Sequence, residues 1–111
     1  MRHASLLTVL AASALFLLGG HARAACFETI GCTDSETFST AALRQLSCDS
    51  LWTARNTIFH ENGYCFQTAR GRANFSNDGC YTSDQAAIRL NSYERANVKA
   101  ITKVEKQKGC R

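Results

Sequence analysis

Apolar residues recur with helical periodicity in the middle of the chain. Leu51, Ala54 and Ile58 are separated by three and four positions, which places them on one side of an α-helix. Ser47 precedes this stripe as a candidate N-cap, and Asn62-Gly63 follows it as a candidate helix end. The pattern therefore predicts an amphipathic helix of about four turns that packs one side against a core.

A second helical stripe occupies the last part of the chain. Asn97, Ile101 and Val104 share one side of it, and lysines occupy the opposite side and the last turns. The sequence Asn91-Ser92-Tyr93-Glu94 has the spacing of a capping box, and Gly109 is placed to end the helix. These features predict a second long amphipathic helix.

The remaining segments carry weaker signals. Residues 68–75 are predicted to form a short helix that begins at Thr68, and residues 40–46 could add one or two helical turns. Residues 25–42 are predicted to be an irregular N-terminal segment, followed by a helical domain over residues 43–111. The expected fold class is all-α: a small, disulfide-stapled three-helix domain with an irregular N-terminal segment.

Residues 1–24 are predicted to be a cleaved signal peptide. A basic start precedes an uncharged run from Ala4 to Leu18, which is too short to span a bilayer comfortably. Ala22 and Ala24 are small residues at positions −3 and −1 of a signal peptidase site, so we place the cut before Ala25. An uncleaved anchor and a lipoprotein attached at Cys26 are weaker alternatives. The expected location is secreted or periplasmic, without stable membrane insertion after cleavage.

Composition and charge limit the class of partner. The chain has 111 residues, 45% of them hydrophobic and 20% charged, which is typical of one globular domain and not of a disordered chain. Removing the leader with Arg2 and Arg23 lowers the formal net charge from +4 to +2. This excess is too small to indicate a nucleic-acid or membrane-surface binder. We expect a monomer with no nucleic-acid partner and no cofactor.

The six cysteines all follow the leader. In an exported chain of this length, an even number of cysteines predicts three disulfides, for which 15 connectivities are possible. A structural metal site is not expected, because there is no C-x-x-C motif and His60 is the only histidine beyond the leader. The cysteines are Cys26, Cys32, Cys48, Cys65, Cys80 and Cys110.

The segment from Leu51 to Phe66 resembles the central helix of the YARHG domain family, which comprises small extracytoplasmic bacterial domains. The segment from Tyr93 to Val98 is similar to the last helix of that family, and the resemblance spans about residues 43–110. Arg55-Asn56 and Gly63-Tyr64-x-Phe66 match the family pattern. At the naming motif, Glu61-Asn62 stands in place of the Arg-His pair. The resemblance implies a fold and an extracytoplasmic location, and it assigns no activity.

Sequence alone does not choose among the 15 connectivities, and we predict the following three bridges. Cys26–Cys32 is local, Cys65–Cys80 closes the small middle helix, and Cys48–Cys110 joins the start of the first long helix to the end of the last.

No catalytic residue is predicted. His60 and Glu61 are adjacent on a helix and point about 100° apart, and the H-E-x-x-H and G-x-S-x-G motifs are absent. Two alternatives to a binding module remain open. One is a small envelope hydrolase that uses His60, Glu61 or Asp84 as acid or base, and the other is an inhibitor of a foreign hydrolase that presents residues 76–83 or 81–91.

The leading hypothesis is a secreted or periplasmic non-catalytic module that binds a cell-envelope component or a protein partner. Its candidate binding residues are Arg55, Tyr64 and Tyr81, and its candidate structural residues are Asn56, Gly63, Glu94 and Asn97. The Arg55 guanidinium could bind an anionic ligand, but we favour an internal role in which it holds Glu94 or a carboxy-terminal carbonyl. Arg44, Arg70 and Arg72 could form a basic face with the lysines of the last helix, although the low net charge favours an ordinary solvated surface.

Overall fold

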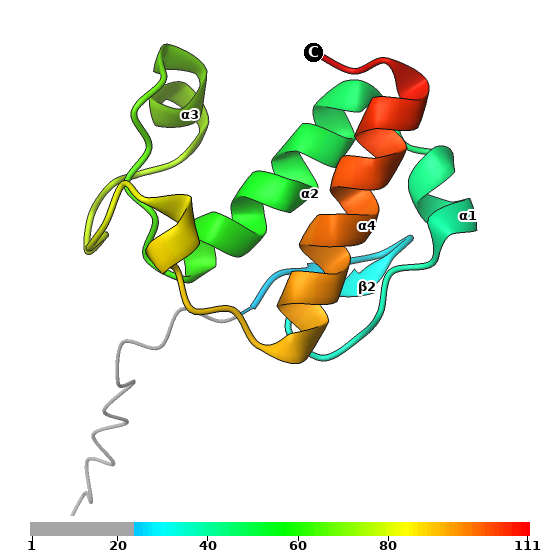
Figure 1. The fold of residues 1–111 in the computed structure, drawn as a ribbon, viewed down its shortest axis with the longest axis horizontal. Helices are drawn as coiled ribbons and strands as arrows, with labels where there is room; N and C mark the ends of the chain where they lie inside the picture. The colour runs from blue at the N-terminus through cyan, green and yellow to red at the C-terminus, as the bar shows by residue number, and fades with distance from the viewer. Residues whose placement is uncertain (1–23) are drawn as a thin grey trace, which may run out of the picture.

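The computed structural model describes residues 24–111, so the predicted signal peptide lies outside the described residues except for Ala24. Within this range the chain forms four α-helices, one 3₁₀ helix and a two-stranded antiparallel hairpin (Figure 1). The elements are β1 (Cys26–Phe27), β2 (Gly31–Cys32), α1 (Thr40–Arg44), α2 (Cys48–Glu61), α3 (Ala69–Asn74), the 3₁₀ helix η1 (Gln85–Ala87) and α4 (Ser92–Lys108).

Side-chain caps fix the ends of the long helices where the sequence predicts them. The Ser47 hydroxyl accepts a hydrogen bond from the Ser50 amide at the start of α2. At the start of α4, Asn91 and Glu94 form a reciprocal capping box, and Gly109 ends this helix in the left-handed conformation with φ of +69°. The two predicted long helices are confirmed.

The expected helix-rich, disulfide-stapled domain is confirmed, but the number of helices and the all-α class differ from the prediction. A fourth helix, α1, forms because the Ser39 hydroxyl accepts a hydrogen bond from the Ala42 amide and so caps it. The N-terminal segment is also not wholly irregular, because Cys26 and Cys32 face each other in an antiparallel pair and are joined by a disulfide. Gly31, with φ of +110°, supplies a backbone conformation at this hairpin that other residues rarely adopt.

Helices α2 and α4 lie side by side and run antiparallel (Figure 1). The start of α2 is joined to the end of the chain by the Cys48–Cys110 disulfide. At the opposite end of the pair, the Asn62 side-chain amide donates to the Glu94 carboxylate at 2.6 Å. Helix α1 packs on α4, whereas α3 stands apart on the other side of α2 (Figure 1).

The aliphatic core lies between α1, α2, α4 and the N-terminal segment. Ile30 and Phe38 contribute to it from that segment, with 9% and 2% of their surface exposed. Leu43, Leu51, Ile58, Ile101 and Val104 are fully buried. Residues 25–39 are therefore part of the folded core and not an appendage to the helices.

All six cysteines form the three predicted bridges: Cys26–Cys32, Cys48–Cys110 and Cys65–Cys80. The last of these closes a loop that carries α3. We call residues 64–82 the arm, and the remainder of the described chain the body. Within residues 24–111, no helix combines the length and hydropathy needed to cross a bilayer.

Candidate functional site

The most buried polar side chain of α4 binds the backbone of the N-terminal segment. Asn97 is fully buried, and its Oδ1 accepts a hydrogen bond from the Phe38 amide at 2.9 Å. Its Nδ2 donates to the carbonyls of Thr33 (3.1 Å) and Glu36 (2.8 Å). These bonds satisfy backbone groups that no regular element pairs, so Asn97 fixes the path of residues 33–38 across the core.

Glu61, the last residue of α2, binds the start of the described chain. One carboxylate oxygen accepts from the Ala25 amide at 2.5 Å and the other from the Thr33 hydroxyl at 2.9 Å. The Thr33 amide donates in turn to the Ala25 carbonyl at 2.9 Å. Burial raises the pKa of Glu61 above its usual value, and the two hydrogen bonds partly oppose that shift.

A polar cavity of about 180 Å³ lies beside these contacts. It is lined by Ala24, Asp34, Glu61, Asn62, Asn91 and Glu94, which include three carboxylates. The nearby charges of Glu94 and Asp34 add to the rise in the pKa of Glu61. The described lining residues include no lysine or arginine, so no side chain of the cavity wall balances this negative charge.

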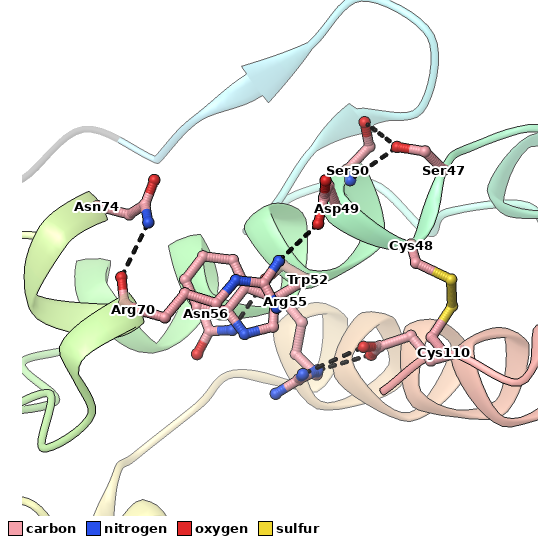
Figure 2. A network of polar contacts seen from close by, with 11 residues as sticks. Ser47, Cys48, Asp49, Ser50, Trp52, Arg55, Asn56, Arg70, Asn74 and Cys110 are labelled. Carbon is pink, nitrogen blue, oxygen red and sulfur yellow. Dashed lines mark hydrogen bonds and ion pairs between the residues drawn. A yellow bond between two sulfur atoms is a disulfide. The ribbon is translucent and has the colours of Figure 1, made fainter.

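Arg55 is engaged within the body. Its Nε and one terminal nitrogen donate to the two carboxylate oxygens of Glu105, at 2.6 and 3.1 Å. This pair joins α2 to α4, and its side chains are only 23% and 14% exposed (Figure 2). The expected partners, Glu94 or a carboxy-terminal carbonyl, are wrong, because Glu105 lies on the turn of α4 that faces Arg55 whereas Glu94 caps the far end.

Tyr64 and Tyr81 lie on neighbouring segments where the arm joins the body. The Tyr81 amide donates to the Gly63 carbonyl at 2.8 Å, and Tyr64 and Thr82 pair in an isolated parallel β-bridge. The Tyr81 ring is 61% exposed and covers Gly63, where an added Cβ would lie 2.4 Å from the ring. Tyr64 is half-buried against Phe66, with ring centroids 4.9 Å apart. Arg55 interacts with α4 and has no contact with this pair among those observed.

Aromatic rings attach the arm to α2. Phe66 and Phe75 of the arm stack at 4.7 Å and 10° between planes. Phe75 also contacts Trp52 at 5.8 Å and His60 at 5.2 Å, both on α2. The His60 ring further lies 3.1 Å from the Ser76 carbonyl through Nε2, so this side chain is occupied by packing and hydrogen bonding with the arm.

Arg70 connects the arm to the first turn of α2. Its guanidinium lies over the Trp52 ring, 3.9 Å from the centroid, and donates to the Asp49 carboxylate at 2.8 Å (Figure 2). Arg72 donates to the Phe66 carbonyl at 3.2 Å. Both arginines therefore have partners within the molecule, although both remain exposed.

An apolar recess lies between the hairpin and the start of α2. Its volume is about 370 Å³, which is within the range of small ligand pockets. We call it the hairpin groove. Its lining residues are Phe27, Glu28, Thr29, Ile30, Leu46, Asp49, Ser50, Thr53 and Ala54. The groove therefore combines apolar side chains with three hydroxyl groups and with the carboxylates of Glu28 and Asp49.

The side chains considered for acid–base chemistry do not meet in one place. His60 faces the arm, Glu61 binds the N-terminal segment, and Asp84 accepts from the Ala86 amide to cap η1. Within residues 24–111, no group of three His, Cys, Asp or Glu side chains is arranged to hold a metal ion.

The candidate structural residues occupy defined places. Asn56 is buried and donates to the Trp52 carbonyl within α2 at 2.9 Å. Glu94 closes the capping box and binds Asn62, and Gly63 makes the turn under Tyr81. Sequence reasoning missed the hairpin groove, because its residues from 27 to 30 carry no periodic pattern. It also missed the contact of Glu61 with Ala25, since the two are 36 positions apart.

The family model of the YARHG domain matches residues 27–106. This range begins in β1, so it includes the N-terminal segment as well as the helices, in agreement with the shared core. No curated protein and no solved structure matches the chain.

Proposed function

From the premise that the chain belongs to the YARHG domain family, we propose that it is an exported, non-catalytic module that binds a protein partner in the cell envelope. The observation that carries this proposal is the hairpin groove, which combines an apolar surface with hydroxyl and carboxylate groups. The dispersed positions of His60, Glu61 and Asp84 support a binding role over acid–base catalysis, which requires groups that reach one reacting centre.

The chemistry of the groove favours a partner segment that inserts an apolar side chain and carries a positive charge beside it. Phe27, Ile30 and Ala54 offer apolar contact area, and Glu28 and Asp49 are the charged residues of the lining. Glu28 is exposed and makes no side-chain hydrogen bond among those observed, so its carboxylate is free to pair with a lysine or arginine of a partner. Such a pair would add more to specificity and association rate than to affinity.

Site-specific photo-cross-linking in cells that export the protein tests this proposal. A photoreactive residue at Thr53, an exposed lining residue, should give a discrete protein adduct. The matched control is the same residue at Ala96, which is exposed on α4. Substitution of Glu28 by Lys should weaken the adduct at position 53. Equal adducts at 53 and 96, or none at 53, would overturn the proposed use of the groove.

A further inference from the structure

The described lining of the acidic cavity beside Glu61 includes no lysine or arginine, but a backbone nitrogen points at its carboxylate. The amide of Ala25 points at the Glu61 carboxylate with a separation of 2.5 Å, and the next residue back, Ala24, lines the cavity. The Thr33 amide holds the Ala25 carbonyl at 2.9 Å, so the position of this nitrogen is set by the fold of the hairpin segment. The sequence predicts that signal peptidase cuts the peptide bond between Ala24 and Ala25, which is the bond that contains this nitrogen.

We propose that this cavity is a binding site for the α-ammonium group of Ala25, which forms when the signal peptide is removed. The proposal rests on the export that is part of the proposed function. Signal peptidase adds water across the Ala24–Ala25 bond. Ala24 leaves with the new carboxylate, and the new amine on Ala25 takes up a proton at neutral pH. The backbone donor to Glu61 thereby becomes a cation, and the cavity gains the charge that its walls lack.

The electrostatic consequence is a more stable mature chain. Before the cut, Glu61 is half-buried with a neutral donor, and Asp34 and Glu94 lie close enough to repel its charge. After the cut, an ion pair with a hydrogen bond replaces that neutral contact. Charge-assisted hydrogen bonds of this kind are about twice as strong as neutral ones. Removal of the signal peptide would thus stabilise the fold through the Glu61 carboxylate.

The pH dependence has a definite sign. The charged groups that face the site are Glu61 on α2, Glu94 on α4 and Asp34 in the N-terminal segment. All three carboxylates raise the pKa of the Ala25 ammonium group above its unfolded value of about 8. The extra stability requires both charges. It is therefore present between the pKa of Glu61 and about pH 8, and it is lost as the pH rises through the higher folded pKa of the amine. In a chain with an amide at this position, the raised pKa of Glu61 gives stability only at acid pH, and this stability is lost as the pH rises.

Two forms of the oxidised protein test the site. One begins at Ala25, and the other carries Gly-Ser before Ala25, which moves the ammonium group two residues away. The extension should lower the melting temperature at pH 7 by about 4 to 8 °C, and the difference should shrink above about pH 9. In a Glu61→Gln background the extension should have almost no effect, whereas in the matched Glu28→Gln background the full effect should remain. Intact mass of the exported protein should show Ala25 as its first residue.

Three outcomes would overturn the proposal: a mature chain that starts elsewhere, an extension effect that survives Glu61→Gln, or a difference that does not change with pH. If Glu61→Gln does not fold, the pKa of the Ala25 amine in the unsubstituted protein decides the question. A value raised above 8 supports the site, and an ordinary value overturns it. None of these results affects cross-linking at Thr53, so the proposed function is tested separately.

Discussion

The body and the arm are held together by different kinds of contact. In the body, side chains from distant parts of the sequence meet. Asn97 binds the backbone of residues 33–38, and Arg55 pairs with Glu105. In the arm, the Cys65–Cys80 bridge closes a short loop, and aromatic rings lie on one side of α2. The body should therefore unfold as one cooperative unit, while the arm can open without it.

This difference also separates the two proposed binding sites from the arm. The hairpin groove and the acidic cavity are both lined by body residues. The arm reaches the groove at one point, where Arg70 binds Asp49 (Figure 2). The position of the arm can therefore alter one charge of the groove lining without disturbing the apolar surface.

The largest effect is expected from the long-range disulfide. Replacing both Cys48 and Cys110 by serine removes a bridge with a sequence separation of 62, which should cost about 4 kcal/mol of unfolding free energy in the chain-entropy model. The matched pair Cys65→Ser/Cys80→Ser opens a loop with a separation of 15 within the arm. It should change the unfolding free energy of the body by less than about 1 kcal/mol. Chemical denaturation of both variants measures the contrast, and equal losses would contradict the separation of body and arm.

Loss of the Asn97 side chain should have the next largest effect. The change Asn97→Ala leaves one amide and two carbonyls of the N-terminal segment without partners in the core. We expect a cost of about 3 kcal/mol, measured by the same denaturation experiment. Asn74→Ala is the matched control, because the Asn74 amide makes one exposed bond to the Arg70 carbonyl within the arm. A similar loss for the two variants would show that the buried asparagine does not hold the segment.

Breaking the Arg55–Glu105 pair should destabilise the body by about 2 kcal/mol, since Arg55→Ala leaves a mostly buried carboxylate without its partner. Thermal unfolding should record a fall of several degrees. The double variant Arg55→Ala/Glu105→Ala should lose less than the sum of the two single variants. An unchanged melting temperature, together with lost partner binding, would instead assign Arg55 to a binding surface.

The smallest effect on global stability is expected from Arg70→Ala. The ion pair with Asp49 is exposed, and the contact with Trp52 is a single cation–π interaction, so the melting temperature should change by less than about 4 °C. Hydrogen exchange of the amides in residues 64–82 should nevertheless become faster. If exchange in the body accelerates equally, the arm is not an independent unit.

The sequence was informative where a structural signal is local and repeated. Helical periodicity and side-chain caps located α2 and α4, and the predicted placement of these helices led to the Cys48–Cys110 bridge. The other two predicted bridges are close in sequence, and both are confirmed. The hairpin could not be predicted, because strands of two residues are too short to show alternation. The partner of Arg55 depends on which turn of α4 faces it, and no sequence pattern specifies that alignment.

The candidate site was less predictable than the fold for the same reason. Glu61 meets Ala25 across 36 positions, and Arg70 reaches Asp49 across 21. Each contact depends on how separate elements pack, not on the residues beside it. Tyr81, a candidate binding residue from the sequence, is 61% exposed.

Native-state hydrogen exchange of the oxidised mature protein tests the division into body and arm most directly. The amides of Phe38, Ile58 and Ile101 should exchange only on global unfolding, with one common opening free energy. The amides of Gly71 and Phe75 should exchange through smaller openings that leave those three protected. A single opening free energy for all five amides would contradict the account.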